Sequence, residues 1–305
     1  MSSGRRGYLY GVAAYLCWGL FPLYWKLLRP STPVEILAHR IVWSFLLVLV
    51  VVLVTRGWRR INGMTRPRTL GLITLAAMLI AVNWGTYIYG VNSDRVVETS
   101  LGYFINPLVT VLLGVLVLRE RLRPAQWAAI GVGAIAVAVL TVDYGHVPVL
   151  ALVLAITFGL YALIKKRLAV PAADGLLLES GVLALPALAF LLVLGAQGTS
   201  SVGNVSAGHT TLLVLSGAVT AVPLLLFAGA ANRIPLSAIG LLQYLAPILQ
   251  LGCGVLVFHE PMPPARLAGF ALVWLALTLF TWDGIRHIRV AHRTAAIASR
   301  NPVPV

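Results

Sequence analysis

Apolar residues dominate the chain in long runs, and this pattern predicts membrane-spanning helices. A helix needs about 20 residues to cross the hydrocarbon core of a bilayer, and ten segments approach or reach that length. The expected spans are Tyr8–Leu28, Ile36–Thr55, Leu70–Gly90, Val97–Leu118, Gln126–Val142, Pro148–Ile164, Gly175–Ala196, Thr210–Ala231, Leu236–Phe258 and Arg266–Trp282. Little sequence remains between them, so we expect no soluble domain. The pattern predicts an all-α integral membrane protein.

A repeat relates the two halves of this pattern. Residues 100–128 align with residues 240–268 without a gap, at an offset of 140 positions. Residue pairs that match at this offset include Pro107 with Pro247, Glu120 with Glu260, Lys26 with Lys166 and Asn92 with Asn232. Such self-similarity indicates that one ancestral unit has been duplicated. We therefore divide the chain into a first repeat (1–143), a second repeat (144–285) and a basic tail (286–305).

Each repeat contains five expected spans, and five is an odd number. The second repeat must therefore enter the membrane in the orientation opposite to the first. Inverted repeats of this kind are typical of secondary transporters, because two similar halves provide two equivalent conformations that face opposite sides. The predicted fold is ten transmembrane helices in two inverted five-helix repeats.

The distribution of charge predicts how the chain is oriented. Charged residues make up 10% of the sequence, against about 25% in a typical soluble protein. With the N-terminus inside, most of the 23 basic residues fall on the cytoplasmic side, as the positive-inside rule requires. The basic residues left on or near the outer side are Lys26, Arg29, Arg40, Arg95 and Arg266. The net charge of +14 therefore indicates contact with anionic lipid headgroups and not with nucleic acid, and both termini are expected in the cytoplasm.

Polar residues inside the spans are candidates for a solute pathway, because such residues are costly in a membrane. Amides and aromatic rings suit a small amphipathic solute, and these spans contain Asn83, Trp84, Tyr87, Tyr103, Asn106, Gln243 and Tyr244. The same amides would also serve simply to link helices, and both interpretations stay open. Lys26, His39 and Arg40 would give the outer half of the pathway a positive bias that favours a carboxylate. Amino-acid-like metabolites are the first substrate class to consider.

Two residues in matched spans are candidates for proton coupling. His39 and Glu179 are 140 positions apart, in the second and seventh spans. Histidine and a buried carboxyl group are the side chains that most readily exchange protons near neutral pH. In the structural alternative, Glu35 pairs with Arg40 or Lys26 near the outer headgroups, and Glu179 only forms hydrogen bonds within the bundle.

Prolines interrupt several spans and are candidate hinges. A proline removes one backbone donor and frees a carbonyl, which commonly kinks a helix. The prolines of interest are Pro22, Pro107, Pro223 and Pro247. They would either permit motion between two conformations or only shape the helices. Glu120 and Glu260 end their helices at matched positions, and we expect each to fix a loop through an ion pair.

Enzyme signatures are missing from the sequence. His259 and Glu260 are followed by Pro-Met-Pro, so the second histidine of a zinc-protease motif is absent. Cys17 and Cys253 have no metal-type spacing. We therefore predict no catalytic residue, no metal and no cofactor. Two other classes stay open: a membrane-embedded enzyme acting on lipid-linked substrates, and a receptor or partner subunit that transports nothing.

Four motifs occur in order along the chain. They are Phe21-Pro-Leu-Tyr-Trp-Lys26, Glu35-Ile-Leu-Ala-His-Arg40, Asn83-Trp84 with Tyr87, and Ser100-Leu-Gly-Tyr-Phe-Ile-Asn-Pro107. Together they resemble the RarD-type branch of the EamA-like transporters, in the drug/metabolite transporter superfamily, and the resemblance covers residues 7 to 285. It implies ten helices in inverted repeats, a bacterial inner-membrane location, and export or exchange of small organic solutes, amphenicol drugs among the candidates. No ATP-binding motif is present, so a proton or solute gradient would drive transport by a monomer or homodimer.

Overall fold

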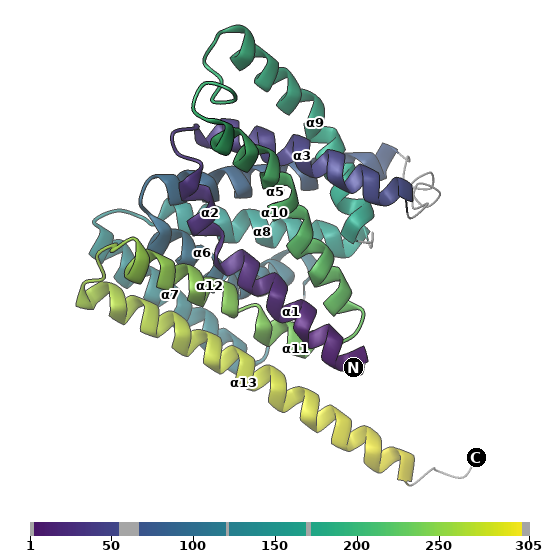
Figure 1. The fold of residues 1–305 in the computed structure, drawn as a ribbon. Coiled ribbons are helices and arrows are strands. Elements are labelled where there is room, and N and C mark those ends of the chain that lie inside the picture. Colours follow the sequence, from purple (N-terminus) through teal and green to yellow (C-terminus); the bar gives the residue numbers. More distant parts are fainter. Residues whose placement is uncertain (1–2, 55–66, 120–121, 169–171, 301–305) are drawn as a thin grey trace. The chain divides into compact units, whose positions relative to one another are not determined.

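A computed structural model of the chain describes residues 3–54, 67–119, 122–168 and 172–300 (Figure 1). Every regular element in these residues is a helix. In order they are α1 (Ser3–Gly19), α2 (Phe21–Leu27), α3 (Pro33–Val54), α5 (Pro67–Asn92), α6 (Val96–Leu118), α7 (Pro124–Tyr144), α8 (Val149–Leu168), α9 (Ala172–Ala196), α10 (Ala207–Ala231), α11 (Leu236–Leu242), α12 (Leu245–Gly252), the π-helix η2 (Cys253–Val257) and α13 (Pro264–Arg300). Two parts of the chain discussed above lie outside these ranges, namely Glu120 and the tail end 301–305.

Seven helices are long and apolar enough to cross a membrane by themselves: α3, α5, α6, α7, α9, α10 and α13. Two shorter apolar segments follow the same pattern, Val149–Lys165 in α8 and Leu245–Val257 in α12 and η2. Large apolar side chains such as Val142 and Leu185 are 82% and 77% exposed. Outward-facing apolar side chains of this size are expected where lipid replaces water. The chain is therefore a multi-pass membrane protein.

Two of the expected spans consist of more than one helix. The first divides into α1 and α2 at Leu20, and Pro22 lies in the first turn of α2, where its missing N–H is tolerated. The ninth divides into α11 and α12 at Gln243 and Tyr244. Pro247 lies just after this break. Its backbone nitrogen carries no hydrogen, so it cannot donate to the carbonyl of Gln243 four residues earlier. Pro107 and Pro223, in contrast, lie inside the continuous helices α6 and α10.

The helices form two compact units that do not coincide with the sequence repeats. The first unit comprises Met1–Asn106 and Val149–Pro261, and the second comprises Pro107–Pro148 and Met262–Val305. Each unit therefore combines segments from both halves of the chain. The repeats are expected from matching residues at an offset of 140 positions, whereas these units describe which helices pack together.

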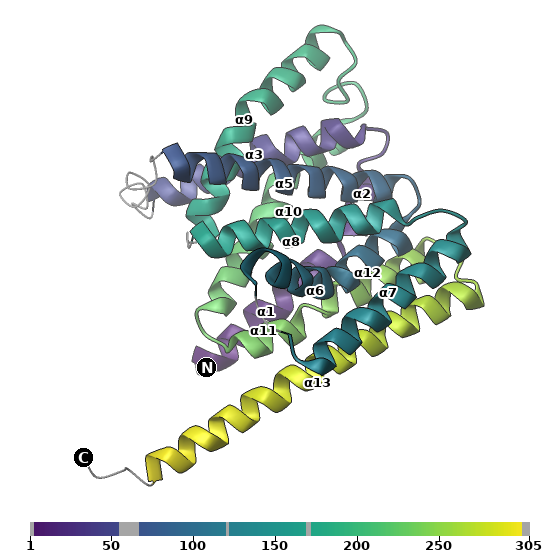
Figure 2. The same ribbon diagram turned by 180° about the vertical axis from the view of Figure 1, so that it is seen from behind.

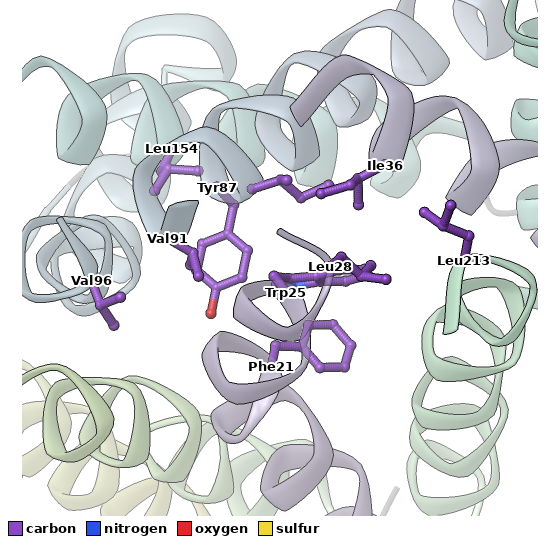
Figure 3. Close-up of a cluster of buried hydrophobic side chains, with 10 residues drawn as sticks. Phe21, Trp25, Leu28, Ile36, Tyr87, Val91, Val96, Leu154 and Leu213 are labelled. Carbon is purple, nitrogen blue, oxygen red and sulfur yellow. The ribbon is translucent and has the colours of Figure 1, made fainter. Parts of the chain in front are cut away.

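Within the first unit, α3 packs against α9 and α10, α1 packs against α10 and α12, and α5 packs against α8 (Figure 2). One buried cluster joins α2, α3, α5, α6, α8 and α10 (Figure 3). Its members are Phe21, Trp25, Leu28, Ile36, Tyr87, Ile88, Val91, Val96, Leu154 and Leu213. The short helix α2 is held by this cluster, because Trp25 and Leu28 are fully buried in it.

Glu260 fixes the start of α6 within the same unit. Its carboxylate is buried and accepts hydrogen bonds from the backbone N–H groups of Val96 (2.6 Å) and Val97 (2.7 Å), the first two residues of the helix. These N–H groups have no partner inside the helix, so a carboxylate stabilises them directly. The role of Glu260 is structural, as expected. Its described partners are backbone amides of a distant helix, and not the local ion pair that the sequence suggested.

In the second unit, α7 and α13 run antiparallel along one another (Figures 1 and 2). Arg123 at the start of α7 donates from Nε to Oδ2 of Asp283 in α13 at 2.7 Å. Arg266 in the first turn of α13 donates from Nε to Oδ2 of Asp143 in the last turn of α7 at 2.8 Å. One ion pair therefore joins the two helices near each end of their contact.

Candidate functional site

Arg40 is a buried charge surrounded by aromatic rings. It lies seven residues after the start of α3 and is only 3% exposed. Its guanidinium carbon is 3.9 Å from the ring centroid of Trp84, 5.0 Å from that of Trp25 and 5.7 Å from that of Phe21. The ion pairs of the described residues do not include Arg40, and its Nε has no hydrogen-bond partner. Arginine keeps its charge in proteins, so this charge is held by π-faces.

Two neutral donors near Arg40 are also unsatisfied. Trp25 Nε1 is fully buried and Tyr87 is 2% exposed, and neither Trp25 Nε1 nor the Tyr87 hydroxyl has a hydrogen-bond partner. Figure 3 shows the Tyr87 hydroxyl pointing away from α5, on the side where Phe21 and Trp25 of α2 lie. Buried polar groups normally have partners, so these three donors are candidates to bind an acceptor from outside the chain.

Tyr103 and Asn83 extend this neighbourhood towards α8. The Tyr103 ring packs edge-on against Tyr87 with centroids 5.5 Å apart, and its hydroxyl donates to Asn83 Oδ1 at 3.4 Å. Asn83 Nδ2 donates to the carbonyl of Leu154 (2.9 Å) and to Thr157 Oγ1 (3.0 Å). Asn83 therefore links α5 to α8, as in the structural interpretation, while its oxygen accepts a hydrogen bond from Tyr103.

We call Arg40, Trp25, Trp84, Tyr87 and Tyr103 the arginine–aromatic site. Its members lie at similar depth: Arg40 and Tyr103 are seven residues from the starts of α3 and α6, and Trp84 is eight residues from the end of α5. At 1.5 Å per residue these positions are about 10–12 Å from the helix ends. α3, α5 and α6 therefore bring Arg40, Trp84 and Tyr103 to one level along the bundle.

Lys26 and Glu35 have partners other than those expected. The Lys26 ammonium pairs with Asp94 and lies 3.9 Å from the Phe258 ring centroid. Glu35 accepts hydrogen bonds from the backbone N–H of Ser201 (2.7 Å) and from its hydroxyl (2.8 Å). The expected pairing of Glu35 with Arg40 or Lys26 is therefore wrong. The α9–α10 loop supplies the partners of Glu35, and it is 165 positions away in sequence, so local spacing gave no sign of them.

Several polar contacts gather at the α2–α3 end of the first unit, and we call them the polar ties. Lys26 and Arg29 both contact Asp94 in the α5–α6 loop, Ser31 Oγ lies 2.7 Å from His209 Nε2 at the start of α10, and Glu35 contacts Ser201 as above. The hydrogen bonds from Lys26 and Arg29 lower the pKa of the Asp94 carboxyl below its ordinary value. The polar ties therefore hold the α2–α3, α5–α6 and α9–α10 loops, with the adjoining helix ends, together at one end of the bundle.

The two coupling candidates occupy different surroundings. His39 Nδ1 accepts a hydrogen bond from Trp43 Nε1 at 3.3 Å, and its Nε2 has no partner. Glu179 is buried, pairs with Lys165 Nζ at 2.8 Å, and accepts from the Tyr161 hydroxyl at 3.0 Å. Lys165 lies near the end of α8. The start of α8 is held by Glu98 beside the start of α6, so Glu179 belongs to the end of α8 opposite the polar ties.

The remaining sequence candidates do not surround the guanidinium of Arg40. Gln243 and Tyr244 lie in the break between α11 and α12, and Asn106 lies in α6. In their place the structure brings Phe21 and Trp25 to the site. Their signal in the sequence is a spacing of four residues, which puts both rings on one face of a helix. In the described part of the chain, no group of three His, Cys, Asp or Glu residues is arranged to hold a metal.

Comparison with known proteins gives consistent results. Residues 5–142 match the EamA-like transporter family. "Protein RarD" of Streptomyces exfoliatus is 56% identical over 286 residues, covering 93% of this chain and 91% of that protein. The "Uncharacterized transporter YojE" of Bacillus subtilis is 42% identical over 291 residues (94% and 97%), and the "Chloramphenicol-sensitive protein RarD" of Pseudomonas aeruginosa is 30% identical over 297 residues (95% and 98%). A solved crystal structure with 21% identity has a TM-score of 0.59 over 92% of this chain and 98% of its own, which indicates a shared fold.

Proposed function

The chain belongs to the RarD-type branch of the EamA-like transporter family, and on this premise we propose that it is a secondary active transporter for a small organic solute in the bacterial inner membrane. The arginine–aromatic site is the observation that carries the proposal. A charged residue inside a membrane bundle marks a substrate or ion pathway by default, and Arg40 is charged, buried and surrounded by aromatic rings that suit an organic solute.

Ten spans in two inverted repeats are part of this proposal, and the ion pairs of the second unit support it. Asp143 and Asp283 are 140 positions apart, so they are equivalent positions in the two repeats. Each pairs with an arginine near the start of the other helix, Arg266 for Asp143 and Arg123 for Asp283. A two-fold relation between α7 and α13 in the membrane plane produces this reciprocity, and inverted repeats are related by such an axis.

Transport would proceed by alternating access. The polar ties hold one end of the first unit together, and the ion pair of Glu179 with Lys165 lies towards the other end. Opening one end while the other stays closed would carry a solute past Arg40. Breaks at Leu20 and at Gln243–Tyr244 give two helices a place to bend, with Pro22 and Pro247 beside them. Pro107 and Pro223 are weaker hinge candidates, because their helices are continuous.

A proton or solute gradient would drive the cycle, with His39 and Glu179 as the coupling residues. Both are buried and both lie on helices of the first unit. Protonation of Glu179 would break its ion pair with Lys165. The protonation state of Glu179 would then decide whether this end of the first unit is closed. If Glu179→Gln and His39→Ala variants keep wild-type transport and its pH dependence, proton coupling through these residues is wrong.

Orientation and assembly are proposed from sequence. The positive-inside rule favours cytoplasmic termini and contact of the basic loops with anionic lipid, and the protein would act as a monomer or homodimer. An embedded enzyme is disfavoured because the similar proteins of this branch are named as transporters. A receptor or partner subunit that moves nothing is the competing class.

Reconstitution tests the proposal. Purified protein in liposomes should take up at least one labelled solute from a panel of amino acids, nucleosides and chloramphenicol, with saturation and with acceleration by unlabelled solute on the opposite side. Protein-free liposomes are the control. If the protein binds a solute by thermal shift but moves none under proton or solute gradients, the receptor class is favoured instead.

A further inference from the structure

We propose that Arg40 binds the carboxylate of the transported solute, and that the surrounding rings hold a flat apolar part of the same molecule. This assignment rests on the proposed transport function and names its substrate class: organic monocarboxylates with an aromatic or similarly flat body. The starting observation is a buried guanidinium whose neighbours supply rings and donors.

The first step of the argument concerns charge. Arg40 stays protonated even when buried, and no described carboxylate lies within ion-pair distance of it. Attraction to π-faces offsets only part of the desolvation of a charge. The described part of the site therefore holds an excess positive charge that an anionic ligand would neutralise.

The second step concerns the geometry of the guanidinium. Its carbon lies over the Trp84 ring at 3.9 Å, so stacking uses the flat face of the group. The N–H donors lie in the plane of the guanidinium and point outward from its edge, and Nε has no partner. An arginine edge donates two parallel hydrogen bonds to the two oxygens of a carboxylate. Stacking on Trp84 thus orients Arg40 without using its donors.

The third step concerns the number and type of the other groups. The unsatisfied groups beside Arg40 are the indole N–H of Trp25 and the hydroxyl of Tyr87, and both are neutral donors. A carboxylate offers about four lone-pair positions, enough for these donors together with the arginine. A single arginine matches one negative charge. Lys26 pairs with Asp94, so it adds no second charge of the kind that a phosphate dianion needs.

The rings define the rest of the solute. Phe21, Trp25 and Trp84 face the guanidinium, and Tyr87 and Tyr103 pack edge-on against each other beside it. Aromatic rings favour stacked or edge-on contact with a second flat group. The site is buried in this structure, so the solute would enter when the polar ties break and α2 and α3 move away from their neighbours.

Matched pairs of ligands test this assignment on the full-length protein in detergent. The probes are phenylacetate, indole-3-acetate and L-phenylalanine, each compared with its amide, and the readout is the midpoint of thermal unfolding as a function of ligand concentration. A ligand that binds the folded state raises the midpoint in proportion to its saturation. We expect the acids to raise the midpoint and the amides to be at least about thirtyfold weaker, as for loss of one partner of a buried charge pair.

Variants locate the effect. Arg40→Met and Arg40→Lys should each weaken binding of the acids by at least about thirtyfold, because lysine keeps the charge but not the planar fork. Arg233→Met is the matched control: Arg233 also lies over an aromatic ring, that of Tyr10 at 5.5 Å, but is exposed, and its loss should leave binding unchanged. Wild-type affinity in both folded Arg40 variants overturns the assignment.

The ligand results also separate this assignment from the transport function. Equal shifts by acids and amides, or no shift by either, overturn the carboxylate class. If the same preparation, reconstituted, transports a neutral or cationic solute, and Arg40→Met transports it equally well, transport stands and only the role of Arg40 falls.

Discussion

Arg40 and Arg266 are both shielded from solvent, yet they differ in their partners. Arg266 is 13% exposed as a side chain, pairs with Asp143 and also lies over the Tyr144 ring at 4.2 Å. The nearest ring to Arg40, that of Trp84, is 3.9 Å away, but Arg40 takes part in none of the ion pairs among the described residues. The two arginines therefore share residue type and burial. They differ in that only Arg266 is paired with a described carboxylate.

We propose that this difference separates a structural charge from one that binds a ligand. Arg266 and Asp143 satisfy each other and hold two helices together, so a ligand would have to displace an existing bond. Arg40 presents an unused edge, so a ligand would gain a bond that the protein alone does not make. A buried charge by itself says little about function, and its partners decide the assignment.

Breaking the Arg266 pair should produce the largest loss of stability. Arg266→Met leaves the buried carboxylate of Asp143 unpaired, and removing one member of a buried pair destabilises a protein by about 3–5 kcal/mol. We expect a clearly lower midpoint of thermal unfolding in detergent. The double variant Arg266→Met with Asp143→Leu should recover much of the loss, because no charge is then left alone. Equal destabilisation by the single and double variants would contradict the pairing.

The matched change at Arg40 should act in the opposite direction. Arg40→Met removes a charge that has no described counter-charge and keeps a similar apolar volume, so the free energy of unfolding should stay level or rise by about 1–4 kcal/mol. The measurement is the same midpoint, without ligand. A loss as large as that of Arg266→Met would mean that Arg40 is held by a carboxylate partner, and the comparison would fail.

Glu260 provides a test of intermediate size. Glu260→Ala removes both acceptors from the first two N–H groups of α6, and loss of a charged cap of this kind costs about 1–3 kcal/mol. Glu260→Gln keeps one acceptor and should cost less. Hydrogen exchange of the amides of Val96 and Val97 should rise in both variants, more in the alanine variant. Unchanged exchange at these two amides would show that they have another partner.

The smallest effect is expected at Asp94, which is 61% exposed as a side chain. Exposed ion pairs contribute about 1 kcal/mol or less, so Asp94→Asn should barely move the midpoint. Because its pKa is lowered in the folded state, the tie contributes fully above the ordinary carboxyl pKa of about 3.9 and is lost as the pH falls through the lower folded value. The contribution of Asp94 to stability should therefore be constant between pH 5 and pH 8. A midpoint change across that range that disappears in Asp94→Asn would contradict this sign.

The helices were predictable from sequence because long apolar runs have few alternatives in a membrane. The breaks were harder. Pro107 and Pro247 occupy matched positions, yet α6 continues through the first while α11 ends before the second. A proline permits a break and does not require one, since neighbouring helices can satisfy the freed carbonyl.

The candidate site was predictable in part, for a physical reason. Arg40, Trp84, Tyr87, Tyr103 and Asn83 were singled out because polar and aromatic residues inside spans need an explanation. Trp25 and Phe21 were missed because apolar rings in an apolar run look like core. The partners of Glu35 and Lys26 were missed because they come from loops distant in sequence, and only the packing of the bundle brings them close.

Solute exchange in proteoliposomes tests the central claim most directly. The solute is the labelled carboxylate with the largest midpoint shift, and wild-type, Arg40→Met and Arg266→Met proteins are compared per folded molecule. We predict saturable exchange by wild type, exchange near the wild-type rate by the folded fraction of Arg266→Met, and loss of exchange in well-folded Arg40→Met. Wild-type exchange by Arg40→Met would contradict the account.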